Sequence, residues 1–108
     1  MTPFIIAEPG CTAEGRKDVM LDLIGVSASA GASAFKAQWT SSAASMAARR
    51  RAGSEYLAAY RWLEFPMDWH QEFAVACHAK GMQYGCSTYL PHDVATVHPF
   101  IDFHKLSS

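Results

Sequence analysis

Apolar and polar residues alternate with a period of two in the middle of the first half of the chain. Phe35, Ala37 and Trp39 fall on one side of this pattern, and Lys36 and Gln38 fall on the other. A period of two is typical of a β-strand, whose successive side chains point to opposite faces. The pattern therefore predicts a strand with one apolar face and one polar face.

Two other stretches, residues 16–30 and 68–80, carry apolar residues at helical spacing. Gly31 and Gly81 follow them and can end a helix, because glycine readily adopts the left-handed conformation. Further strands are expected over residues 3–7, 82–90 and 100–106. The first of these is a continuous apolar run, which predicts a fully buried parallel strand. Strands that alternate with helices predict an α/β fold with a parallel sheet in sequential order.

Residues 40–66 form a connection much longer than the usual two to six residues between a strand and a helix, so we expect a lid or a binding loop. A small-residue helix is expected to open it and to end at Arg49–Arg51, which are most simply a solvated helix end. The aromatic residues that follow could stack on a sugar or pack the loop against the sheet, and both readings stay open. They are Tyr56, Tyr60, Trp62 and Phe65.

The composition excludes several classes of function but does not identify one. Hydrophobic residues make up 50% of the 108 residues, charged residues 18%, and the net charge is -1. A near-neutral chain has no basic field to attract nucleic acid or an anionic membrane, and no apolar run approaches the ~20 residues of a membrane span. Cys11, Cys77 and Cys86 are odd in number and widely spaced, which favours reduced thiols and a cytoplasmic location.

Polar side chains stand at the carboxyl end of every predicted strand, where ligands of parallel sheets gather. They are Glu8, Lys36, Gln38, Ser87, Thr88, Lys105 and Ser108. Lysines, an amide and hydroxyls beside one carboxylate would suit a ligand that carries phosphate or carboxylate. Lys36 either is buried and needs an anionic partner, or lies in water on an edge strand.

Four motifs in order carry a resemblance to a known family. The motifs are Phe4–Gly10, Gly31-Ala32 before Phe35–Gln38, Gly81–Tyr84 before Ser87-Thr88, and Lys105–Ser108. Together they resemble the N-terminal part of the sialic acid synthase (N-acetylneuraminate synthase) family. The resemblance implies a (β/α)8 TIM barrel, of which residues 1–108 would be the N-terminal half, with four parallel strands. It also implies a transferase of carbohydrate biosynthesis that condenses phosphoenolpyruvate with an N-acyl amino sugar, assisted by a divalent metal (Mn or Mg).

The same resemblance assigns site residues. It implies that Lys36, Gln38, Thr88, Lys105 and Ser108 surround phosphoenolpyruvate. It places Glu8 beside the aldehyde end of the sugar, and it makes Glu8, Lys36 and Lys105 the catalytic residues.

The sequence also departs from the family's pattern. Thr12 and Ala13 replace the usual Asn-His pair, and Tyr89-Leu90 replace the usual Pro-Phe, which affects the identity of the sugar more than the use of phosphoenolpyruvate. A complete barrel needs about 250 residues. We therefore expect a truncated fragment that is inactive alone and binds no metal by itself, or a half-barrel that pairs as a homodimer or with a complementing half.

Two other functions stay open. One is an aldolase in which Lys36 or Lys105 forms a Schiff base, and the other is a non-catalytic half-barrel module. The histidines lack the three- or four-residue spacing of helical metal ligands, so no metal site is expected within the chain. His70 and His78 are expected on a helix surface, and Cys77 and Cys86 in the core.

Overall fold

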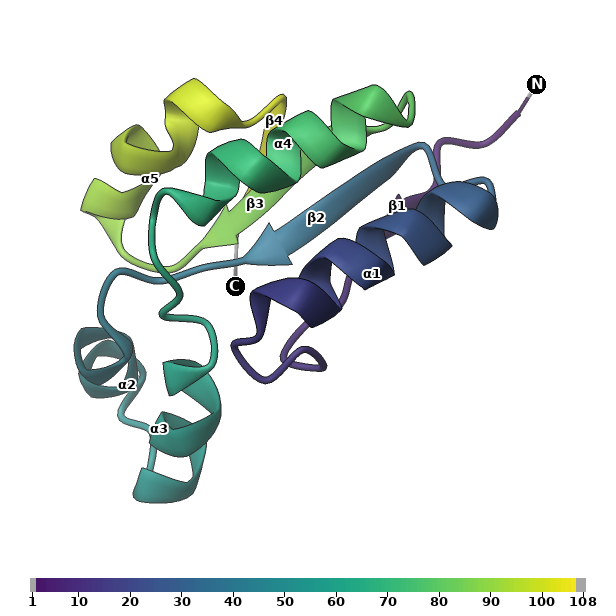
Figure 1. The fold of residues 1–108 in the computed structure, drawn as a ribbon. Coiled ribbons are helices and arrows are strands. Elements are labelled where there is room, and N and C mark those ends of the chain that lie inside the picture. Colours follow the sequence, from purple (N-terminus) through teal and green to yellow (C-terminus); the bar gives the residue numbers. More distant parts are fainter. Residues whose placement is uncertain (1, 107–108) are drawn as a thin grey trace.

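The computed structural model describes residues 2–106, which build a parallel sheet with helices in its connections (Figure 1). The elements are β1 (Ile6–Ala7), α1 (Lys17–Ser29), β2 (Ala34–Gln38), α2 (Ala43–Arg50), α3 (Ser54–Arg61), α4 (Trp69–Ala79), β3 (Gln83–Thr88), α5 (Pro91–Val97), the 3₁₀ turn η1 (His98–Phe100) and β4 (Phe103–Leu106). The four strands lie in the order β1-β2-β3-β4, and each neighbouring pair is parallel. The predicted α/β fold and sequential strand order are confirmed.

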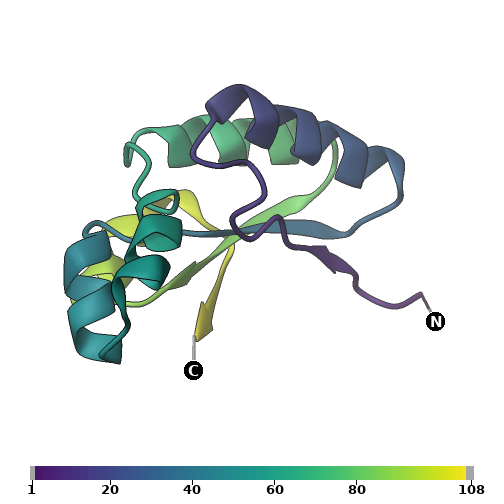
Figure 2. The same cartoon turned by 90° about the horizontal axis from the view of Figure 1, so that it is seen from below.

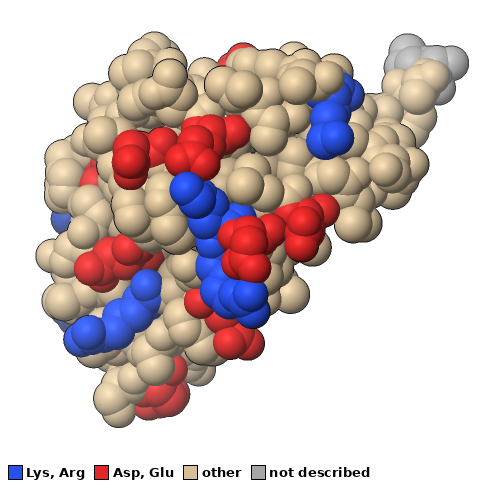
Figure 3. Space-filling model, in the orientation of Figure 1, with Lys and Arg blue, Asp and Glu red and all other residues tan. Residues whose placement is uncertain are grey.

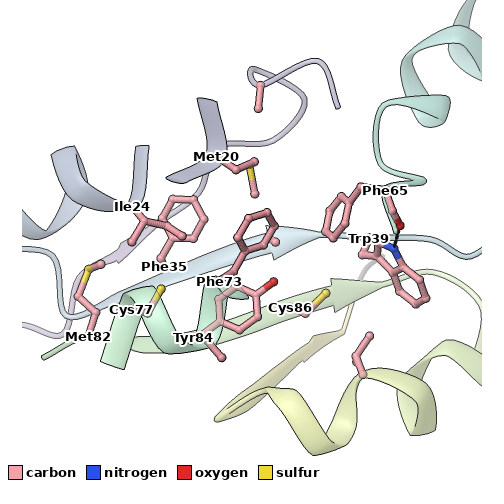
Figure 4. Close-up of a cluster of buried hydrophobic side chains, with 14 residues drawn as sticks. Met20, Ile24, Phe35, Trp39, Phe65, Phe73, Cys77, Met82, Tyr84 and Cys86 are labelled. Carbon is pink, nitrogen blue, oxygen red and sulfur yellow. Dashed lines mark hydrogen bonds between the residues drawn. The ribbon is translucent and has the colours of Figure 1, made fainter. Parts of the chain in front are cut away.

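One face of the sheet is covered by α1 and α4, whereas no helix among residues 2–106 covers the opposite face (Figure 2). The apolar side of β2 and the neighbouring side of β3 pack against these helices. Met20 and Ile24 from α1 meet Phe35 of β2, while Phe73 and Cys77 from α4 meet Tyr84 of β3 (Figure 4). Removing this apolar surface from water stabilises the fold, so the covered face is the hydrophobic core.

Residues 40–66 form a helical hairpin of α2 and α3 beyond the carboxyl ends of β2 and β3 (Figure 1). The second helix, α3, was not expected. Phe65 is buried, and its carbonyl accepts a 2.8 Å hydrogen bond from the Trp39 indole, whereas Tyr56 is 55% and Trp62 42% exposed. Phe65 therefore packs the insertion onto the sheet, while the exposed rings of Tyr56 and Trp62 leave the sugar-stacking reading open.

Two sequence-based expectations are wrong. The strand at residues 3–7 is parallel but spans only Ile6–Ala7. Phe4 is 58% and Ile5 52% exposed, because β1 lies at the edge of the described sheet. His70 is not a surface residue but lies fully buried in the first turn of α4, where Nδ1 lies 2.7 Å from the Tyr84 hydroxyl. His78, by contrast, is exposed as expected and pairs with Asp102 at 2.7 Å.

Candidate anion-binding site at the carboxyl ends of the strands

The strand register places polar side chains next to one another on the face that no helix covers. Gln38 of β2 pairs with Ser87 of β3, and Ser87 pairs with Lys105 of β4. Lys36 lies two residues before Gln38 and so points to the same face. Neighbouring strands lie only about 4.8 Å apart, so the register alone gathers these groups into one cluster.

Lys36 is the buried centre of this cluster, with 1% of its surface exposed. Its Nζ donates to Ser87 Oγ at 2.5 Å and lies 3.0 Å from Glu8 Oε1. Of the two alternatives left open for Lys36, the structure thus supports a buried lysine with a carboxylate partner. The Glu8 side chain is 45% exposed, so water also solvates the carboxylate and reduces the cost of burying the pair.

The cluster lines a hollow of about 250 Å³ whose walls are almost entirely polar. Three cations and one carboxylate line it, which leaves an excess of two positive charges in a chain whose net charge is -1. Charges of both signs are mixed on the side that carries α1 and α4 (Figure 3), with no uniformly basic region in that view. The lining residues are Glu8, Lys36, Gln38, Arg50, Ser87, Tyr89 and Lys105.

The structure brings together four of the six residues assigned from the sequence, Glu8, Lys36, Gln38 and Lys105. Thr88 is not among the residues that line the hollow, because side chains alternate along β3 and its neighbour Ser87 takes the inward position. Ser108 lies outside the described residues. The geometry therefore places Ser87 at the hollow and Thr88 outside its lining, and the binding roles of Thr88 and Ser108 stay predictions.

Sequence reasoning missed Arg50 and Tyr89. Arg50 is the last residue of α2, and its guanidinium carbon lies 5.0 Å from the centre of the Tyr89 ring. It belongs to the basic run that had been interpreted as a solvated helix end, and Arg49 and Arg51 are indeed exposed. Only the contact with Tyr89, the residue that follows β3, distinguishes Arg50 from these neighbours.

Asp93 was also missed. It is fully buried, and Oδ2 accepts a 2.9 Å hydrogen bond from the Ser41 backbone N–H. His92 Nε2 lies 3.3 Å from Asp93 Oδ1 and 3.1 Å from Ser41 Oγ. A catalytic triad needs the two ring nitrogens to face different partners, whereas here one nitrogen faces both. Asp93 therefore ties the segment after β2 to α5, and the trio is not a nucleophile system.

Cys77 and Cys86 are core residues, as expected from the sequence. Burial raises the pKa of each thiol to about 12, so both stay protonated at neutral pH. Cys11, Cys77 and Cys86 are all free thiols. Neither buried cysteine is thus a nucleophile.

Among residues 2–106, no group of three or more histidine, cysteine or acidic side chains comes close enough to hold a metal ion. The described residues therefore do not fit the metal that the resemblance implies. Within the same range, no helix has both the length and the apolar character needed to cross a bilayer.

The parallel sheet with a polar hollow at its strand ends is the arrangement of α/β proteins of TIM-barrel type, and the solved structures below share this fold. Within that class, the family model named NeuB matches residues 23–108. The chain belongs to the NeuB family. No curated protein matches the sequence.

Solved structures give the same fold. The N-acetylneuraminic acid (sialic acid) synthetase from Leptospira borgpetersenii serovar Hardjo-bovis, in complex with citrate, superposes with a TM-score of 0.78 at 21% identity, over 95% of this chain and 35% of that one. A putative spore coat polysaccharide biosynthesis protein E from Chromobacterium violaceum gives 0.77 at 16%, over 99% and 34%. Spore coat polysaccharide biosynthesis protein spsE from Bacillus subtilis gives 0.69 at 23%, over 95% and 28%. The chain thus spans about a third of these proteins.

Proposed function

We propose that this chain provides the phosphoenolpyruvate-binding half of a synthase that condenses phosphoenolpyruvate with an N-acyl amino sugar to give a nonulosonic acid. Membership of the NeuB family supports this, as does the excess of positive charge at the carboxyl ends of the strands. The observation that carries the proposal is the buried ammonium of Lys36, which is held between Glu8 and Ser87. A lysine placed at the carboxyl ends of parallel strands, where ligands of such sheets gather, supports anion binding there.

The proposed reaction needs electrostatic placement more than covalent help from the protein. C3 of phosphoenolpyruvate attacks the aldehyde carbon, the aldehyde oxygen takes up a proton, and water replaces phosphate at C2. Lys36 and Lys105 would neutralise the phosphate and the carboxylate, and Gln38 would orient them by hydrogen bonding. Glu8, at the open side of the hollow, would lie at the aldehyde end of the sugar.

The remaining components belong to the complete enzyme. A divalent ion, Mn or Mg, would supply Lewis-acid assistance from residues outside those described. The edges of β1 and β4 would pair with the other strands of an eight-stranded barrel, from the same polypeptide or from a partner such as a second copy. We place this enzyme in the cytoplasm, where its substrates would be made.

Calorimetric titration with phosphoenolpyruvate tests the binding part of the proposal. Lys36→Met and Lys105→Met should each weaken binding about 10- to 100-fold, the value of a charge-assisted hydrogen bond. Lys80→Met is the matched control, because Lys80 is exposed at the C-terminal end of α4 and does not line the hollow. Equal binding by all four proteins would refute the assignment.

Two further experiments address catalysis. An ion pair with Glu8 requires Lys36 as an ammonium, whereas a Schiff base requires a neutral amine, so borohydride with pyruvate should trap no adduct on Lys36 or Lys105. A trapped adduct would favour the aldolase. We expect the 108-residue chain alone to release no phosphate from phosphoenolpyruvate, and release that depends on both sugar and metal would contradict this.

A further inference from the structure

Two exposed histidines, His98 and His104, lie next to each other at the start of η1 and in β4. Nδ1 of His98 lies 2.9 Å from Nε2 of His104. His104 precedes Lys105, whose side chain lines the hollow, and successive side chains of a strand point to opposite faces. His104 therefore points away from the hollow, and the pair takes no part in the proposed function.

The two imidazole rings meet edge to edge. Their planes differ by 2° and their centroids are 5.2 Å apart, a separation close to the largest that a 2.9 Å contact between these nitrogens allows. The two nitrogens therefore lie between the ring centres, and one of them donates an N–H to the lone pair of the other. The contact is thus a hydrogen bond in the plane of the rings and not a face-to-face stack.

The distance between these nitrogens also suits a metal ion. Two nitrogens that bind one ion with bonds of about 2.0–2.1 Å lie roughly 2.8–3.4 Å apart when the bond angle is about 90–110°. The separation of His98 Nδ1 and His104 Nε2 falls within this range. Because both side chains are exposed, a small rotation of the rings admits the ion. The shared hydrogen then moves through solvent to the other nitrogen of its own ring, so that both facing nitrogens offer lone pairs.

The backbone holds the pair in position before any ion binds. Val97, which directly precedes His98, is fully buried. His104 is paired in register with Cys86, a core residue of β3. Ligands that are already in place lose little conformational entropy on binding, which favours the bound state.

We propose that His98 and His104 chelate a transition-metal ion such as Zn²⁺, which fastens β4 to the turn before it. Imidazole suits Zn²⁺, Ni²⁺ and Cu²⁺, whereas Mn²⁺ stands at the weak end of the affinity order and Mg²⁺ prefers oxygen. Among residues 2–106, no group of three or more histidine, cysteine or acidic side chains could hold a metal, so the pair supplies two ligands only. Binding is therefore reversible and weaker than at a structural site with four protein ligands.

This inference goes against the sequence-based expectation that the chain binds no metal by itself. That expectation considered histidines three or four residues apart, which share one face of a helix. His98 and His104 are six residues apart, and the bend between η1 and β4 brings them together. Helical spacing could not reveal such a pair.

The test titrates Zn²⁺ and Mn²⁺ separately into the untagged chain and follows binding by calorimetry. We expect one Zn²⁺ per chain and an affinity for Mn²⁺ at least tenfold lower. His98→Asn and His104→Gln should each weaken Zn²⁺ binding at least tenfold. Each variant keeps a hydrogen-bonding atom near the place of the lost ring nitrogen but leaves a single imidazole, so a purely structural role would not produce this loss.

His92→Gln is the matched control, because the His92 side chain is 70% exposed and its ring contacts a serine and an aspartate. This variant should leave the affinity for Zn²⁺ within twofold of the wild type. Thermal unfolding gives a second measurement, since an ion that binds the folded state raises its stability. Zn²⁺ should raise the unfolding midpoint of the wild type and of His92→Gln, but not that of His98→Asn or His104→Gln. Circular dichroism would show that each variant is folded.

Three results would overturn the inference. They are no binding of Zn²⁺, binding that survives unchanged in both His98→Asn and His104→Gln, and an equal loss in His92→Gln, which would indicate adsorption to any exposed histidine. Each would leave the pair as a hydrogen bond only. None of them bears on the proposed function, because phosphoenolpyruvate binding is measured separately and depends on residues of the hollow.

Discussion

Lys36 and His70 are both fully buried titratable residues, but they lie on opposite sides of the same sheet. On the face without helices, Lys36 Nζ lies between Glu8 and Ser87. On the helix-covered face, His70 is packed among aromatic rings and contacts the Tyr84 hydroxyl, and its Nε2 has no hydrogen-bond partner among the described residues. Burial among rings lowers the pKa of His70, whereas the buried Lys36 has a carboxylate and a hydroxyl as partners, so the two faces of the sheet differ in polarity.

The largest effect should come from breaking the helix-covered face. Phe73 of α4 is 0% exposed and lies against Phe65 and Tyr84. Phe73→Ala should lower the free energy of unfolding by about 3–5 kcal/mol, since it removes buried surface and leaves a cavity. Val75→Ala on the same helix is the control, because Val75 is 61% exposed and its truncation should cost under about 0.5 kcal/mol. Equal losses in urea denaturation would mean that α4 does not bury this face.

The next largest effect is that the free energy of unfolding should depend on pH because of His70. Burial lowers the pKa of His70 to about 4, from 6.5. Between these values the unfolded state binds more protons than the folded state, so stability rises with pH and is lost on acidification. The loss begins near pH 6.5, ends near pH 4 and amounts to about 3 kcal/mol, at about 1.4 kcal/mol for each unit of pKa.

Urea denaturation at intervals from pH 7 to pH 4 measures this loss. His70→Phe should remove the part of the slope that His70 causes, whereas His78→Gln should preserve it, because His78 is exposed. A wild-type stability that stays constant from pH 6.5 to pH 4 would show that His70 is not held neutral.

A smaller effect should distinguish the two partners of the ion pair on the open face. Glu8→Gln leaves the buried Lys36 ammonium without its carboxylate and should cost about 1–2 kcal/mol, a value reduced because Glu8 is half exposed. Lys36→Met replaces the ammonium with an apolar group of similar volume, and the freed carboxylate is hydrated, so stability should change by less than about 1 kcal/mol. The double variant should be more stable than Glu8→Gln alone. If Lys36→Met is the more harmful single change, the burial of Lys36 does not need Glu8.

The period of each segment was sufficient to predict most of the fold. The alternation around Lys36 gave β2, and the helical spacing before Gly31 and Gly81 gave α1 and α4, whose glycines have φ of +92° and +77°. Periodicity could not predict that β1 lies at an exposed edge, nor that His70 is buried, because both depend on neighbours that are distant in sequence. For the same reason Arg50 could not be distinguished from Arg49 in the sequence, because its contact with Tyr89 joins residues that are distant along the chain.

The smallest expected effect is on phosphoenolpyruvate binding, and it depends on whether Ser87 or Thr88 of β3 supplies a hydroxyl to the hollow. Motif matching assigned Thr88, whereas the register with β2 and β4 directs Ser87 into the hollow, 2.5 Å from Lys36 Nζ. Ser87→Ala should weaken phosphoenolpyruvate binding about fivefold, because it removes one hydrogen bond of about 1 kcal/mol that orients the ammonium. Thr88→Val keeps the size and β-branching of the side chain and should change the dissociation constant by less than twofold. The reverse result would mean that β3 turns over by one residue when the ligand binds, since a shift of one position exchanges the two faces of a strand.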